Sequence, residues 1–368
     1  MKKLKVIFLV IGIILIGLLL FHEQIGSLTY ETKKIIYEKL LNQEIISQET
    51  GEINNSFFSI DDTGKTDTTN EINEAIQYAK QNNIEYIKFR KGTYLVDGGK
   101  KNQQHKGILL ESNMTIDFNG STIIQKTSKE PYYSVIEVND KENIKILNGI
   151  IQGDRTTHDY QTIQSTHQWG LGIEIKNAKN IQVSNLQIKD MTGDAIYISE
   201  KSENIHISNC TLSQCRRQGI SIIEGKNIDI YQNEIYKIQD QTPQSGIDLE
   251  SNNADQLIEN VKIYDNKFYG FGNNIAIQLY RYINNTEIKN NIIHGKIICY
   301  NVYHQLDIIQ NKIYDGGIQT ENKYTIHTVN VLQNDFTRST VELKGVENAV
   351  VDQNNLYESS IEKENILQ

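Results

Sequence analysis

The sequence predicts an all-β fold, a right-handed parallel β-helix (solenoid) with an N-terminal capping helix and an N-terminal transmembrane or signal segment. Three observations lead to this prediction. Short strands with alternating apolar residues recur from residue 107 onward, and one coil takes about 26 residues, a period typical of solenoids. Two families of such strands alternate along the chain. Finally, one asparagine recurs at a fixed distance after the strands of the second family.

The first predicted segment, residues 1–24, is a signal anchor or a signal peptide. Lys2, Lys3 and Lys5 precede an uncharged apolar run from Val6 to Phe21, which is typical of such segments. No small-x-small cleavage site follows the run. We therefore expect an uncleaved anchor in the cell membrane, single-pass, with an extracellular C-terminal domain. Cleavage and secretion is the alternative.

Residues 25–55 are predicted to be a stalk or helical linker, and residues 56–368 the parallel β-helix domain. Asp67 or Thr68 can cap a helix over residues 69–82 whose apolar side chains share one face. We expect this helix to cover the N-terminal open edge of the solenoid. A strand from Ile84 to Phe89 and a turn at Gly92 follow.

The two strand families differ in the residue before their first inward position. Strict alternation and the many Ile, Val, Tyr and Thr residues favour strands over helices. The first family, with a Gly-Ile-x-Ile character, begins its inward positions at Ile108, Ile136, Ile173, Ile196, Ile220, Ile247, Ile275, Ile297, Ile318, Val341 and Ile361. The second family, with an Asn-Ile-x-Ile character, begins at Ile116, Ile144, Ile181, Ile205, Ile228, Val261, Thr286, Leu306, Val329 and Ala349.

The recurring asparagine lies five residues after the start of six successive second-family strands. Asn tolerates left-handed turn geometry, and stacked amides hydrogen-bond to one another, so we expect a ladder along one turn of the solenoid. Its rungs are Asn233, Asn266, Asn291, Asn311, Asn334 and Asn354.

The composition excludes several classes of protein. The chain has 368 residues, 38% of them apolar, and a formal net charge of -9, so it can form one large domain but is too polar for an integral membrane bundle. No basic stripe is available to neutralise phosphates, which argues against nucleic-acid binding. Three cysteines are too few for a disulfide framework and lack zinc spacing.

At this point the chain resembles the pectate-lyase-like β-helix superfamily, specifically bacterial members with the lyase-type N-terminal segment. The matching residues are Asp67-Thr68-Thr69, Lys91-Gly92-Thr93-Tyr94-Leu95 and the coils from 107 to the end. The resemblance implies action on polysaccharides, as in most known relatives. The polygalacturonase-type pattern of Asn-Thr-Asp, Asp-Asp and Gly-His-Gly is absent, as is the Asp-Pro-His-Glu pattern of alginate epimerases.

Charged side chains gather at outward positions of neighbouring coils. Arg216 and Arg217 enter the coil beside the one that carries Asp248 and Glu250, and Asp194 enters the coil on the other side. We predict these five residues as the catalytic strip. A solvated ladder of compensating charges is the structural alternative.

Two enlarged loops flank this strip, which predicts a cleft. One is the insertion GDRTTHDYQTIQSTHQWG, and the other is QDQTPQSG. Histidines and aromatic rings can contact a sugar from the loops and from outward strand positions. The predicted substrate-binding residues are His158, His167, Trp169, Glu174, Tyr197 and Tyr280.

Three functions fit this arrangement. In a polysaccharide lyase acting on a uronate-containing polymer, Arg216 or Arg217 would neutralise a carboxylate or abstract a proton, while Asp194, Asp248 and Glu250 would bind calcium. In a glycoside hydrolase, Asp248 and Glu250 would be the acid and the base. The third is a non-catalytic glycan-binding surface protein or adhesin. The lyase is the leading prediction; the sequence leaves the glycan and the oligomeric state open.

Overall fold

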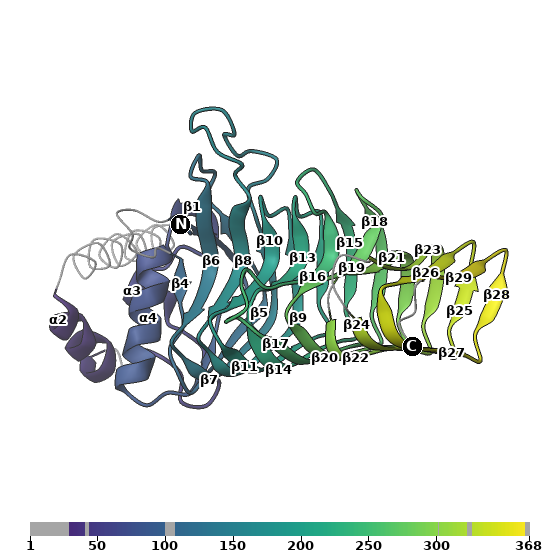
Figure 1. Cartoon of the computed structure of the whole chain (residues 1–368). Helices are drawn as coiled ribbons and strands as arrows, with labels where there is room; N and C mark the ends of the chain where they lie inside the picture. Colours follow the sequence, from purple (N-terminus) through teal and green to yellow (C-terminus); the bar gives the residue numbers. More distant parts are fainter. Residues whose placement is uncertain (1–28, 41–43, 100–106, 301, 322–325, 365–368) are drawn as a thin grey trace, which may run out of the picture.

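The computed structural model describes residues 29–40, 44–99, 107–300, 302–321 and 326–364 (Figure 1). The predicted signal anchor lies outside these residues. Within the described part of the chain, no helix is both long and apolar enough to cross a membrane.

The described strands form a parallel β-helix, with its helical cap at one end and its C-terminal coils at the other (Figure 1). Three sheets run along the solenoid. The first holds β4 (Ile108–Leu109), β6 (Tyr132–Asn139), β8 (Trp169–Lys176), β10 (Asp194–Ser199), β13 (Gln218–Ile222), β16 (Ser245–Glu250), β19 (Ile275–Arg281), β26 (Thr340–Lys344) and β29 (Ser360–Glu364).

The other two sheets complete each coil. The second holds β2 (Tyr86–Lys88), β11 (Ser202–Ser208), β14 (Gly225–Tyr231), β17 (Ile258–Tyr264), β20 (Ile283–Lys289), β22 (Val302–Ile309), β24 (Ile326–Leu332) and β27 (Val346–Asp352). The third holds β1 (Thr63–Asp67), β3 (Thr93–Val96), β12 (Thr211–Ser213), β15 (Glu234–Ile238), β18 (Lys267–Phe271), β25 (Asp335–Thr337) and β28 (Asn355–Tyr357). Long strands that bend between two sheets are β5 (Met114–Gln125), β7 (Glu142–Gln152), β9 (Lys179–Lys189), β21 (Ile292–Cys299) and β23 (Lys312–Thr320).

The inward isoleucines stack as predicted over most of the solenoid. Ile173, Ile196, Ile220 and Ile247 are partners in successive coils and are fully buried. The next prediction is wrong by two residues, because Ile277, not the half-buried Ile275, pairs with Ile247. A shift of two residues keeps the same face inward, so the alternating run could not fix this register.

The predicted register of the second family is wrong in the same way at its first strand. Ile144 pairs with Met114, whereas Ile116 pairs with Ile146. From Ile144 onward the aligned positions are partners as predicted, through to Ala349.

The predicted asparagine ladder is confirmed. Each rung donates from Nδ2 to Oδ1 of the next, at 3.0, 3.0, 2.9, 3.0 and 3.1 Å from Asn233 to Asn354. The inner rungs are buried, and each also donates to a backbone carbonyl of the preceding coil, as Asn266 does to Ile230 at 2.9 Å. The ladder thus satisfies backbone groups at the turn between the second and third sheets.

The N-terminal edge is covered by α4 (Thr69–Gln81), as predicted. Asn73 on this helix accepts from the Leu109 N–H and donates to the Gly107 carbonyl, both at 2.9 Å. These bonds satisfy backbone groups at β4, the first strand of the first sheet. Two shorter elements, α2 (Tyr30–Ile35) and the π-helix η1 (Ile36–Leu40), precede it.

Residues 44–60, with α3 (Asn55–Phe58), also belong to the packed body. Their buried apolar side chains join the core of the solenoid, and the backbone of Glu52 bridges to Lys88 on β2. The predicted domain boundary at residue 56 therefore falls inside a packed segment. These buried residues are Ile45, Ile46, Ile53, Phe57, Phe58 and Ile60.

Candidate functional site

A groove of about 400 Å³ lies on the outer face of the first sheet, over β6, β8 and β10. We call it the first-sheet groove. Its wall is partly aromatic and partly charged. Its lining includes Tyr132, Ser134, Trp169, Glu174, Lys176 and Tyr197, with Asn252 and Gln256 from the loop after β16.

Three aromatic rings follow one another across the coils of this groove. Tyr132 and Trp169 are register partners, and their rings stack with centroids 6.2 Å apart and planes 6° apart. Tyr197 meets Trp169 edge-on at 6.1 Å. Such rings present apolar surface beside a polar rim, the combination that suits a sugar ring.

Arg217 connects the aromatic wall to a buried carboxyl group. Its guanidinium lies 5.1 Å from the centre of the Trp169 ring and donates to Asp194 Oδ2 at 2.7 Å. Burial raises the pKa of Asp194 to about 6, although the charge of Arg217 opposes this shift. Burial acts to lower the pKa of Arg217, but Asp194, Asp248 and Glu250 outweigh burial and raise it, so Arg217 stays charged.

Asp248 is the second buried carboxyl group of the strip. It accepts hydrogen bonds from the amides of Gln218 and Gln278, the latter at 3.1 Å. Burial and the charge of Glu250 raise the pKa of Asp248 well above its usual range, against the effect of Arg217. Two carboxyl groups that hold protons unusually well therefore flank one fixed cation.

A row of buried oxygens lies between these two carboxyl groups. Asp194, Gln218 and Ser245 are in register on three adjacent strands. Asp194 Oδ1, Gln218 Oε1, Ser221 Oγ and Ser245 Oγ are buried and have no hydrogen-bond partner among the described residues. Since buried polar groups normally have a partner, such atoms indicate a place where water or a ligand binds.

Arg216 does not join the strip. Its guanidinium donates to the His167 carbonyl at 2.9 Å and lies 4.6 Å from the centre of the Tyr160 ring. Arg155 from the same insertion pairs with Asp240 in the second loop. These two arginines hold the loops that border the strip in place through their contacts, so the position of Arg216 suits a structural role.

The two predicted histidines lie inside the insertion and do not line the groove. His158 Nδ1 is 2.8 Å from Asp154 Oδ2, His158 Nε2 is 2.9 Å from His167 Nδ1, and His167 Nε2 is 2.7 Å from the Ile163 carbonyl. The Asp154 carboxylate also accepts from Tyr133 Oη and from the Ser128 N–H, at 2.8 and 2.9 Å, so this chain of contacts ties the insertion to the solenoid.

The remaining predicted residues have different positions. Glu174 and Tyr197 line the groove; Glu174 accepts from Ser134 Oγ at 2.6 Å, and burial raises the pKa of Tyr197 to about 12. Tyr280 does not line the groove and instead packs against Tyr300, with ring centroids 5.1 Å apart. Glu250 is in register with Arg281.

The predicted calcium ligands do not converge. Among the residues that the structure describes, no group of three His, Cys, Asp or Glu side chains could hold a metal ion. One oxygen of Asp194 is bound by Arg217, and both oxygens of Asp248 face amide donors. This donor set does not fit calcium in the conformation observed.

Two positions of the candidate site, Tyr132 and Gln218, were not predicted, although the strand alignment contains both. Tyr132 lies four residues before Ile136, as Trp169 does before Ile173. Gln218 lies two residues before Ile220, as Asp194 does before Ile196. Comparing residues upstream of each inward isoleucine would have found both.

Comparisons with known proteins agree on the fold. The family described as right handed beta helix region matches residues 73–260 and 171–331. The Bacillus subtilis protein YclG is 34% identical over 246 residues, which cover 59% of this chain and 42% of YclG. The prophage-derived B. subtilis protein YorA is 30% identical over 226 residues, 55% of this chain and 38% of YorA. The matched regions thus span well under half of either relative.

Solved structures of low sequence identity share the architecture. An exopolygalacturonase from Thermotoga maritima superposes with a TM-score of 0.59 at 13% identity, covering 87% of this chain and 96% of the enzyme. The Streptococcus pneumoniae surface adhesin PfbA gives 0.59 at 15%, covering 83% and 88%. The tailspike gp49 of the Acinetobacter baumannii bacteriophage Fri1, a capsular polysaccharide depolymerase, gives 0.54 at 12%, covering 79% and 60%. Together with the family match and the observed coils, this shows that the chain belongs to the right-handed parallel β-helix proteins.

Proposed function

We propose that this protein binds a polysaccharide in the first-sheet groove and cleaves it. The three similar solved structures named above are a polygalacturonase, an adhesin and a polysaccharide depolymerase, which supports a glycan as the partner. The aromatic wall of Tyr132, Trp169 and Tyr197 would hold the sugar rings.

The observation that carries the proposed cleavage is the pair of buried carboxyl groups beside this wall. Asp194, with a pKa of about 6, can exchange a proton near neutral pH, and Asp248 holds its proton more strongly than a free carboxyl group. Acid–base cleavage of a glycosidic bond uses two carboxyl groups with different proton affinities. Asp194 and Asp248 would take these roles, with Gln218 and Arg217 positioning them.

Hydrolysis fits this geometry better than the initially favoured elimination. Arg217 stays protonated, so it is a poor base for abstracting a proton from a uronate. Asp248 lies two coils from Asp194 and three residues further along its strand than Ser245, the residue in register with Asp194, so the two backbones are about 14 Å apart. Arg217 and Gln218 on the intervening coil bind the two carboxyl groups, which are therefore closer to each other than their backbones are. Such a wide arrangement does not suit a retaining glycosidase and leaves room for the water of an inverting one.

Elimination on a uronate polymer remains the second candidate because Arg217 is a permanent cation beside the groove. It could neutralise a substrate carboxylate, which elimination requires. Calcium belongs to this candidate only as a proposal, since the carboxyl groups observed do not form a site for it.

The test is a panel of neutral and uronate-containing polysaccharides, assayed with and without calcium. Hydrolysis yields new reducing ends, elimination yields ultraviolet-absorbing unsaturated ends, and a binding protein yields neither. On a cleaved substrate, Asp194→Asn or Asp248→Asn should reduce turnover about a hundredfold or more while binding persists. Asp315→Asn, which removes an exposed ion pair with Arg338 on distant coils, is the matched control.

Full activity in both Asp248→Asn and Glu250→Gln would remove the originally predicted acid–base pair from consideration. Full activity in Asp194→Asn as well would reject the strip as the site. Loss of binding in Trp169→Ala, with no products from any glycan, would instead identify a binding protein or adhesin.

We also propose that the chain is held at the outer surface of the cell membrane by residues 1–24. The protein should then fractionate with membranes and be released from intact cells by protease. A mature form in the medium that begins near Ser27 would contradict this proposal and favour secretion.

A further inference from the structure

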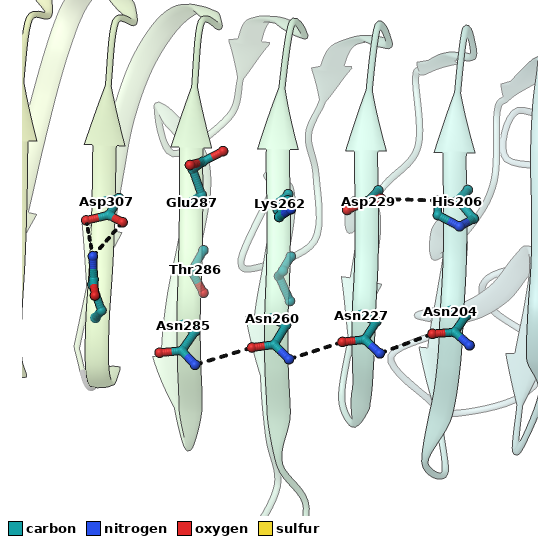
Figure 2. A pocket seen from close by; sticks show the side chains of 12 residues that line it. Asn204, His206, Asn227, Asp229, Asn260, Lys262, Asn285, Thr286, Glu287 and Asp307 are labelled. Atoms are coloured by element: carbon teal, nitrogen blue, oxygen red, sulfur yellow. Dashed lines mark hydrogen bonds and ion pairs between the residues drawn. The ribbon is translucent and has the colours of Figure 1, made fainter.

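A second and larger groove, of about 660 Å³, lies on the outer face of the second sheet (Figure 2). It crosses five successive strands, β11, β14, β17, β20 and β22, and shares no lining residue with the first-sheet groove. We call it the second-sheet groove. The proposed cleavage chemistry does not use it.

One edge of this groove is a rail of amides. Asn204, Asn227, Asn260 and Asn285 occupy equivalent positions, and the last three donate from Nδ2 to Oδ1 of the preceding rung at 3.1, 3.1 and 3.3 Å (Figure 2). Asn204 donates in the same way to Asn180, outside the groove, at 3.0 Å. All four have a positive φ of 54–58°, which asparagine tolerates well. A primary amide has two N–H donors and two lone pairs, so each rung keeps hydrogen-bonding capacity beyond the rail.

Charged side chains of both signs follow the rail two residues further along each strand. Lys262 and Glu287 are register partners on adjacent strands, yet neither makes a hydrogen bond or ion pair with another described residue. Their neighbours are engaged: Asp229 pairs with His206 at 3.2 Å, and Asp307 accepts from Gln305 at 2.9 and 2.7 Å. The centre of the groove therefore offers one free cation and one free carboxylate side by side.

A buried hydroxyl lies beneath the floor of the groove, on the core side of the sheet. Thr286, 2% exposed, lines the groove at a position where the adjacent coils have Val261 and Leu306. Its Oγ1 is buried and has no hydrogen-bond partner among the described residues. An apolar residue would fill this core position at lower cost, because an unpaired buried hydroxyl is unfavourable.

These features select a class of ligand. Val261 is the only lining residue with a wholly apolar side chain, and no Phe, Tyr or Trp lines the groove, which disfavours an apolar protein partner. Three carboxylates face one lysine, which disfavours an anionic polymer. Sugar hydroxyls both donate and accept, so they match amides, a carboxylate and an ammonium together. The rungs repeat at the coil spacing of about 4.8 Å, comparable to the length of one sugar unit.

We infer that the second-sheet groove binds a neutral polysaccharide chain lying along the solenoid axis, separately from the first-sheet groove. Such a site would keep the protein on a glycan surface whether or not the first-sheet groove is occupied. It carries no buried pair of carboxyl groups and would bind without cleaving.

The experiment measures retardation of the full protein by affinity electrophoresis in gels that contain hydroxyethyl cellulose, galactomannan or dextran, with polygalacturonate as the anionic comparison. All proteins carry Trp169→Ala, which disables the first-sheet groove. We expect retardation by at least one neutral polymer and a loss of affinity of at least tenfold in the Lys262→Ala/Glu287→Ala double variant. Neither side chain has a structural contact to lose.

The matched control is Glu142→Ala/Lys145→Ala, which removes the same two charges from exposed positions of β7 on the same sheet, outside the groove. Its affinity should stay within twofold of the parent. The inference is overturned if no neutral polymer retards the protein, if the two double variants behave alike, or if polygalacturonate binds best. Asp194→Asn should leave this binding unchanged, so failure of the proposed cleavage and failure of this site give different results.

Discussion

Asp194 is subject to two opposing forces. Burial favours its neutral form, and the guanidinium of Arg217 at 2.7 Å favours its carboxylate. Burial is the larger effect, and the balance leaves the pKa of Asp194 at about 6 instead of near 3.8. A group so balanced changes its protonation in response to small changes around it, such as a ligand that moves Arg217 away from Trp169.

This balance predicts a specific dependence of stability on pH. Because the pKa is raised in the folded state, the stabilisation is fully present below pH about 4 and is lost as pH rises through about 6. For a shift of about two units the loss is about 3 kcal/mol. In Asp194→Asn this component disappears, so the unfolding free energy should fall less between pH 4 and 6 than in the parent. Urea unfolding across this range measures it.

The raised pKa of Asp248 acts with the same sign, and the charge of Asp194 contributes to raising it, so Asp194→Asn should reduce this second component in the same direction. The control Asp315→Asn removes a group whose pKa is lowered in the folded state, mainly by hydrogen bonds from Arg338; its contribution is lost only as pH falls below about 4, so this variant should leave the slope between pH 4 and 6 as in the parent. Identical slopes for the parent and Asp194→Asn would contradict the raised pKa.

At the scale of the element, the asparagine ladder ties each coil to the next. Asn266 Oδ1 accepts from both the N–H and the Nδ2 of Asn233, while its own Nδ2 reaches the Ile230 carbonyl and the Asn291 side chain. In Asn266→Ala these buried groups lose their partner, which should cost about 3 kcal/mol or more. The half-buried final rung, Asn354, can be replaced by water, so Asn354→Ala should cost about 1 kcal/mol. Urea midpoints compare the two, and equal losses would show that burial of the ladder is unimportant.

The two asparagine rows show what the sequence can and cannot predict about this fold. The buried ladder was predictable, because its spacing follows directly from the inward isoleucines. The outer rail was visible only as the first residue of the Asn-Ile-x-Ile pattern, since its hydrogen bonds depend on the left-handed backbone at each rung. Register was predictable except where three alternating apolar residues, such as Ile275, Ile277 and Leu279, allow a shift of two.

The candidate site was predicted only in part for a related reason. Strand register was predictable and places the coils of Asp194, Arg217 and Asp248 next to one another, because the strands repeat with the coil; Asp194 itself shares the inward parity of Ile196, whereas Asp248 is in register with the outward Ser221. Loop conformation has no such repeat, so the positions of Arg216, His158 and His167 inside the insertion could not be derived from the spacing of the strands. The sequence also gave no sign that Asp194 and Asp248 would be fully buried.

At the scale of the whole molecule, the solenoid separates its two grooves. They lie on different sheets of overlapping coils, so each can be altered by outward substitutions while the shared core stays the same. Each coil contacts mainly its two neighbours, and in such an array a local defect spreads only as far as nearest-neighbour packing carries it.

Two buried phenylalanines at equivalent inward positions of the third sheet test this locality. Phe268 on β18 lies in the middle of the solenoid and packs beside Gly246, two residues before Asp248. Phe336 on β25 lies near the C-terminal end. Both are fully buried, so each change to alanine should cost about 3–5 kcal/mol locally.

Phe336→Ala should accelerate amide hydrogen exchange only in the C-terminal coils and leave glycan binding intact. Phe268→Ala should accelerate exchange in β16 and β18 and weaken any activity that depends on Asp248. Equal acceleration by Phe336→Ala in β8 and β10 would contradict local coupling, because those strands lie several coils away and could respond only if the solenoid unfolded as a single cooperative unit.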